Sequence, residues 1–115
     1  MDGFFAQTII RRRAPLVDDG WGDETRDWDA AIDTPIVGVN VQPNQQGEDD
    51  GVLRTVVATS WRVQSPPGVD LDVVPSDRVV QDGVVCEVVG EVARWPDPIT
   101  GGTHHVEFTI RRTEG

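Results

Sequence analysis

The chain has 115 residues, a size that suits a single domain, and its Val-rich segments are broken by 12 Gly and 8 Pro, which favours strands and loops over helices. The formal net charge is −10 and all 10 basic residues are Arg, so the chain repels phosphate, which disfavours nucleic acid or an anionic membrane as a primary ligand. The single cysteine, Cys86, excludes an internal disulfide and a cysteine-based zinc site, and its place in a Val run is typical of a buried residue.

The N-terminal stretch, residues 4–13, begins apolar and ends in three arginines. It is predicted to form a strand or an extended N-terminal arm over about residues 1–14. Arg11, Arg12 and Arg13 are either a solvated strand end or a contact with an acidic neighbour.

Residues 14–33 are acidic and rich in turn residues, with Trp21 and Trp28 set among the carboxylates. No frame supplies the ligand spacing of an EF-hand loop, so a metal site is not expected. A large aromatic ring in a polar segment normally anchors that segment on its own core or on a partner. We therefore predict an ordered loop here.

Two further strands are predicted on either side of a polar segment. Residues 36–42 alternate, which places Val37, Val39 and Val41 on one face. Residues 44–51 contain no apolar residue and are predicted to form a hydrated loop. Residues 52–63 are predicted to be the longest strand, ending before the two prolines of residues 64–68.

A short apolar and acidic segment, residues 69–74, leads into a three-stranded unit over residues 77–112. Asp82-Gly83 is typical of a tight hairpin turn, and the Pro- and Gly-rich residues 96–102 require a second reversal. In the last strand Val106, Phe108 and Ile110 share one face. These five or six strands predict a mainly β fold, a small antiparallel β-barrel or sandwich with long loops.

Nothing in the sequence indicates catalysis, and an enzyme is not expected. The only histidines, His104 and His105, are adjacent, so we expect them to point to opposite faces of a strand and not to share one metal ion or substrate atom. The chain contains no nucleophile elbow, phosphate-binding glycine loop or metal-ligand spacing. Function by binding is the remaining interpretation, with no cofactor.

Several short motifs occur in a distinctive order between residues 15 and 112. In that order they are an acidic turn with Gly20 that ends at Asp27-Trp28, Val39-x-Val41-Gln42-Pro43, Trp61, Pro67-Gly68, Asp77-Arg78-Val79, Gly83, Gly90 and Arg94-Trp95-x-x-Pro98-x-x-Gly101. This order resembles the head-to-tail stopper, or head-closure, proteins of long-tailed bacteriophages with siphovirus morphology, particularly those that infect high-GC actinobacteria.

The resemblance implies a small β-barrel that assembles in the host cytoplasm into a ring, usually a dodecamer, in the virion neck. Such a ring lies between the portal-bound adaptor protein and the tail terminator or tail tube, closes the DNA channel and offers a docking surface for the tail. The position of the family's channel loop corresponds here to Gln45, Gln46, Gly47, Glu48, Asp49 and Asp50. Acidic loops around a lumen would let DNA slide without sticking, in a non-specific contact.

Repulsion among acidic copies must be offset at the subunit interfaces, and we predict that the arginines meet the acidic segment of the next copy. The predicted subunit or partner interface comprises Arg11, Arg12, Arg13, Asp18, Asp19, Trp21, Asp27 and Trp28. Alternative functions are a tail terminator or head-tail joining protein of the same neck, and a cytoplasmic β-barrel adaptor with no virion role. A metal-activated hydrolase is a third class, which would require a stable divalent-metal site.

Overall fold

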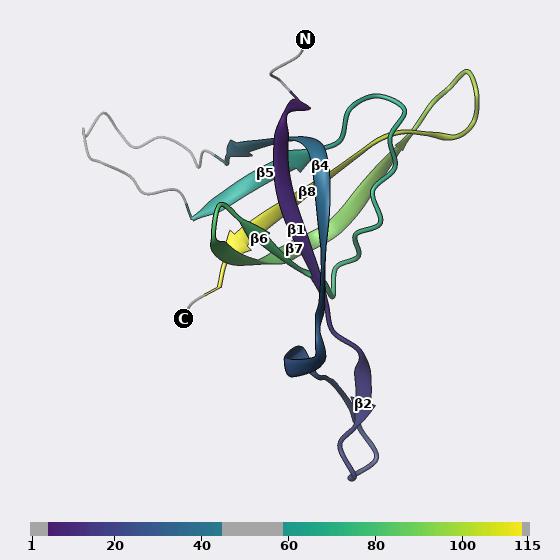
Figure 1. The fold of residues 1–115 in the computed structure, drawn as a ribbon. Helices are drawn as coiled ribbons and strands as arrows, with labels where there is room; N and C mark the ends of the chain where they lie inside the picture. Colours follow the sequence, from purple (N-terminus) through teal and green to yellow (C-terminus); the bar gives the residue numbers. More distant parts are fainter. Residues whose placement is uncertain (1–4, 45–58, 114–115) are drawn as a thin grey trace, which may run out of the picture.

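The computed structural model describes residues 5–44 and 59–113. Its main body is a closed antiparallel barrel with the strand order β1-β4-β5-β8-β7-β6. The barrel strands are β1 (Gln7–Arg13), β4 (Ile32–Pro43), β5 (Ser60–Gln64), β6 (Arg78–Gln81), β7 (Val84–Pro96) and β8 (Thr103–Arg112). Because β1 pairs with both β4 and β6, the sheet closes on itself (Figure 1). The predicted small antiparallel barrel is confirmed.

A second, two-stranded sheet projects from this barrel. It consists of β2 (Leu16–Asp18) and β3 (Glu24–Arg26), followed by the short 3-10 helix η2 (Trp28–Ala30). Figure 1 shows this hairpin extending well away from the barrel. The acidic segment predicted as an ordered loop is therefore a β-hairpin with a helical turn.

The core lies inside the barrel and includes the predicted apolar face of β8. Val106, Phe108 and Ile110 are completely buried. Leu71 and Val73, from the connection between β5 and β6, are also buried although they belong to no strand. The remaining core residues are Ile9, Val39, Val41, Val63, Val79 and Cys86.

The prediction that Val37 shares a face with Val39 and Val41 is wrong. Val37 is 72% exposed whereas Val39 is fully buried. Between them Gly38 has a φ of 77° and the pairing register of β1 with β4 shifts between Gln7 and Thr8. A bulge at a glycine inserts one extra residue, which moves the following side chains to the opposite face.

The predicted three-stranded unit is present as β6, β7 and β8. Asp82 and Gly83 form the β6–β7 turn, both with positive φ, as an Asp-Gly hairpin turn requires. Gly90 does not end the strand: β7 continues through it, with a register shift against β8 between Val89 and Ala93. In the predicted strand 52–63, residues 52–58 lie outside the described residues, and β5 begins at Ser60.

Candidate interaction surfaces

The three consecutive arginines bind carboxylates of their own chain. Arg12 makes a bidentate pair with Asp33, with Nε and Nη2 at 2.8 and 3.0 Å from the carboxylate oxygens. Arg11 donates to the side chain of Asp72 at 3.0 Å and to its carbonyl at 3.1 Å. Arg13 reaches both Asp72 and Asp77. All three guanidinium groups therefore have carboxylate partners within one copy. Their contact with the acidic segment of a second copy stays a prediction.

The pairing shifts the acid-base equilibria of these groups. The hydrogen bond from Arg12 lowers the pKa of Asp33, and the hydrogen bond from Arg13 lowers the pKa of Asp72. The hydrogen bond to Asp77 is the main cause that raises the pKa of Arg13. The ionised forms of Asp33, Asp72 and Arg13 are therefore favoured, and the cluster links the end of β1 to the start of β4 and to the segment before β6.

The turn between β2 and β3 is held by its own carboxylates. Asp18 accepts a hydrogen bond from the Gly20 amide at 2.8 Å, and Asp19 accepts one from the Trp21 amide at 2.7 Å. At the other end of the hairpin, Asp27 accepts from the Asp29 amide at 3.2 Å and so caps η2. The acidic residues therefore stabilise the turns of the hairpin and also give it negative charge.

The two tryptophans of this segment have different environments. The guanidinium carbon of Arg78, on β6, lies 3.9 Å from the ring centroid of Trp28, a cation–π contact with the barrel. Trp21 lies in the β2–β3 turn and is 88% exposed. Of the two predicted anchors, Trp28 is held on its own chain, whereas Trp21 is presented to solvent.

A second hairpin, formed by β7 and β8, also presents an apolar tip. Ile99 in its turn is 90% exposed. Asp97 orders this turn by accepting from the Ile99 amide at 2.8 Å, and this backbone hydrogen bond lowers the pKa of Asp97. Figure 1 shows the β2–β3 and β7–β8 hairpins projecting from the barrel in different directions.

The expectation that the two histidines point to opposite faces is wrong. His104 Nδ1 and His105 Nδ1 are 2.9 Å apart, and His105 Nε2 lies 2.7 Å from a carboxylate oxygen of Glu107. The His105 ring also stacks on Trp95. The irregular β7–β8 pairing between Trp95 and Pro96 lies opposite these residues, so ideal strand alternation does not apply there. Within residues 5–44 and 59–113 no group of three potential metal-ligating side chains occurs.

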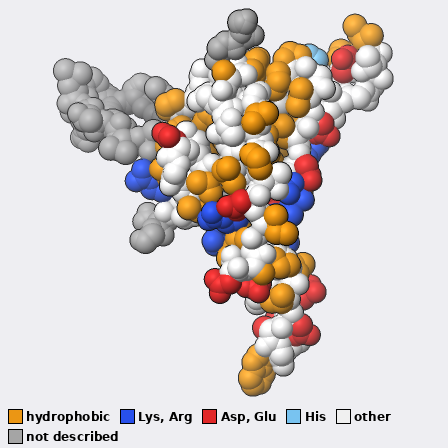
Figure 2. Space-filling model, viewed as in Figure 1, with side chains coloured by type: hydrophobic (Ala, Val, Ile, Leu, Met, Phe, Trp, Pro, Cys, Tyr) orange, Lys and Arg blue, Asp and Glu red, His pale blue; other side chains and the backbone are white. Residues whose placement is uncertain are grey.

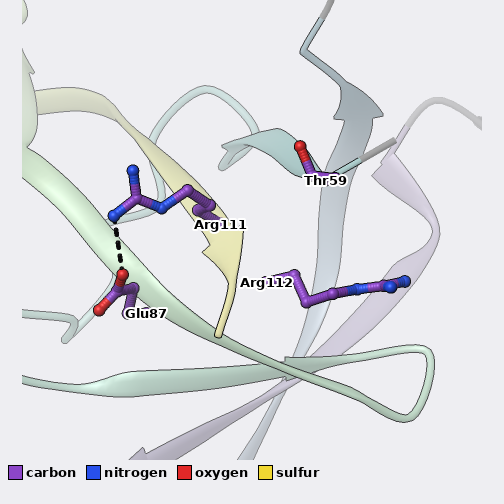
Figure 3. A pocket seen from close by; sticks show the side chains of 4 residues that line it. All are labelled: Thr59, Glu87, Arg111 and Arg112. Carbon is purple, nitrogen blue, oxygen red and sulfur yellow. Dashed lines mark hydrogen bonds and ion pairs between the residues drawn. The ribbon is translucent and has the colours of Figure 1, made fainter. Parts of the chain in front are cut away.

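A pocket of about 380 Å³ lies where β5, β7 and β8 meet, and Thr59, Glu87, Arg111 and Arg112 line it. Figure 3 shows Arg111 turned toward Glu87, with an ion pair of 2.8 Å, while Arg112 extends in another direction. The Arg112 side chain makes no ion pair or hydrogen bond within the described part of the chain. The sequence analysis did not predict this pocket. Its only sequence signal was the pair of adjacent arginines at the end of the last strand.

The predicted channel loop, Gln45 to Asp50, lies outside the described residues. In the described part, no helix is long and apolar enough to cross a membrane. Comparison with models of known protein families finds none that matches the chain, and a search of curated proteins finds no match.

Proposed function

We propose that this chain is a head-to-tail stopper of a long-tailed bacteriophage, a non-catalytic virion protein that forms a ring in the neck and closes the DNA channel. The order of sequence motifs over residues 15–112 suggests the family. The structural observation that supports it best is a closed barrel from which ordered hairpins project. Each barrel strand has a partner on both sides along part of its length, which leaves little free strand edge on the barrel itself. The projecting hairpins and exposed side chains are then the main surfaces through which copies can meet.

The charge distribution supports the same proposal. Figure 2 shows acidic groups along the projecting hairpin, and arginines interspersed with acidic groups on the barrel above it. A subunit with an acidic projection is suited to head-to-tail contact with a basic site on an identical neighbour. The total charge of −10 also keeps a lumen built from such subunits from binding DNA tightly.

The test is to locate the chain in purified phage particles by electron microscopy of the neck. A ring between the adaptor and the first tail ring is the expected result. A ring seated directly on the tail tube would identify a tail terminator instead, and absence of the chain from particles would overturn a virion role altogether.

A loss-of-function experiment separates the two neck functions independently. Heads that lack a stopper have no plug, so they should lose packaged DNA and remain without tails. Heads made without a terminator should keep their DNA, while the tails should be abnormal in length. Retention of DNA in the absence of this chain would therefore contradict the stopper proposal.

A further inference from the structure

Trp21 is an exposed aromatic side chain on an ordered support. The backbone amides of Gly20, Trp21 and Asp23 all donate to carboxylates of the same turn, and the Asp19 amide donates to the Asp23 carbonyl at 2.9 Å. A Trp that is 88% exposed on a turn held in this way is pre-organised for contact, because little conformational freedom remains to be lost on binding.

The surroundings of Trp21 determine what kind of surface it fits. Asp18, Asp19, Asp23 and Glu24 flank it, and none of them makes an ion pair within the described residues. Figure 2 shows acidic groups along the hairpin and hydrophobic groups at its end. The complementary surface must therefore offer a cation for the ring face and positive charge for the carboxylates.

The pocket lined by Thr59, Glu87, Arg111 and Arg112 has these properties. Arg112 has no carboxylate partner within the described residues, and Arg111 contributes a second guanidinium that is shared with Glu87. The pocket, with a volume of about 380 Å³, is open to solvent, so a side chain of a neighbouring copy can reach it. The chain already uses the same chemistry once, where Arg78 covers Trp28.

The geometry points to a contact in which the Trp21 hairpin of one copy inserts into the Arg111–Arg112 pocket of the next copy. The hairpin projects away from its own barrel (Figure 1), so the exposed Trp21 and the carboxylates beside it are accessible to a neighbour. The two surfaces differ, so the contact is heterologous, and repeating it produces a ring when the rotation closes. This inference rests on the proposed ring-forming function and identifies its subunit contact.

The experiment places the photoreactive residue benzoylphenylalanine at position 21 and irradiates concentrated purified protein. The expected result is a crosslink between copies that maps to the peptides containing Thr59 or Arg112. Arg112→Glu should lower the crosslink yield about tenfold or more, because it removes the cation and adds repulsion. Adding Asp23→Arg and Glu24→Arg to Arg112→Glu should restore the crosslink yield, because the charges of the two surfaces are then both reversed. The side chains of these two residues make no hydrogen bond or ion pair within the described residues, so the reversal removes no contact that holds the hairpin.

Ile99→Ala is the matched control, because Ile99 is an equally exposed apolar tip that the contact does not use. A crosslink that maps elsewhere, that is absent, or that persists unchanged in Arg112→Glu would overturn the contact. Failure of the contact and failure of the stopper function are distinguishable in particles. Neck rings that assemble normally with Trp21→Ala would reject this contact and leave the stopper function standing, whereas a chain absent from the neck would reject the function itself.

Discussion

Arg13 forms a bidentate ion pair with Asp77, with both nitrogen–oxygen distances at 2.8 Å, and the Asp77 carboxylate is almost completely buried. The same carboxylate accepts a hydrogen bond from the Val74 amide at 2.9 Å. The pair therefore connects the end of β1 to the segment that carries the buried Leu71 and Val73. Arg13, the last of three consecutive arginines, therefore holds two distant segments of the fold together.

Removing Arg13 should destabilise the protein strongly. Arg13→Leu leaves the Asp77 carboxylate buried without a counter-charge, and we expect a loss of about 3 kcal/mol, at the low end for a broken buried pair because Arg13 itself is partly exposed. Arg12→Leu, which breaks a solvent-exposed pair with Asp33, is the matched control and should cost much less.

Urea unfolding measures both free energies of unfolding. Adding Asp77→Asn to Arg13→Leu should recover part of the loss, because the amide oxygen keeps the hydrogen bond from Val74 without the charge. Equal losses of unfolding free energy in Arg13→Leu and Arg12→Leu would contradict the role assigned to burial of the Asp77 carboxylate.

Acid should destabilise the fold through its paired carboxylates. Hydrogen bonds lower the pKa of Glu107, chiefly from Arg62 and then from His105, below its ordinary value of 4.5. A carboxyl whose pKa is lower in the folded state stabilises the fold fully above its ordinary pKa and loses that contribution as the pH falls through the lowered value. The pKa values of Asp33 and Asp72 are lowered in the same way by their arginines.

The melting temperature should therefore fall as the pH decreases from about 5 to about 3. The melting temperature of Arg62→Gln should fall less steeply over that interval than that of the unmodified protein. Arg62 is largely exposed and also donates to Thr109, so the comparison concerns the slope with pH and not the absolute stability. Parallel pH profiles for the two proteins would show that the Arg62–Glu107 pair is not responsible.

The thiol of Cys86 should be unreactive in the native protein. Cys86 is fully buried in the barrel, and burial raises its pKa to about 11, against a smaller opposing effect of Arg112. Because the thiolate is the reactive form, Ellman's reagent at about pH 8 should label it only after unfolding. Rapid labelling in native buffer, at a rate that urea does not increase, would contradict a closed barrel around this residue.

The bulge at Gly38 should require glycine. Its φ of 77° lies in the left-handed region, and a Cβ there would meet only the Phe5 carbonyl oxygen at 3.9 Å, so backbone strain and not collision is the cost. We expect Gly38→Ala to destabilise the protein by about 1 kcal/mol or more. Gly102→Ala is the control, because Gly102 has no positive φ and space for a Cβ. Equal melting temperatures for the two variants would show that the bulge adapts without strain.

Elements whose signals are local could be predicted from the amino-acid sequence. Period-two alternation marks β8 and its buried face, because every second side chain of a strand lies on the same side. Asp82-Gly83 marks the β6–β7 turn, because a tight hairpin turn requires positive φ at these positions. The mainly β class and the approximate number of barrel strands followed from such signals.

Contacts between residues that are far apart in the sequence depend on the folded arrangement of the strands. Arg13 and Asp77 are 64 positions apart, and their pairing depends on the barrel bringing β1 beside the segment before β6. Trp21 and Trp28 have similar acidic surroundings in the sequence, yet one is exposed and the other is covered by Arg78 from β6. The bulge at Gly38 and the pocket beside Arg112 likewise arise from pairing between distant strands, because side-chain contacts across a sheet are set by register and not by local sequence.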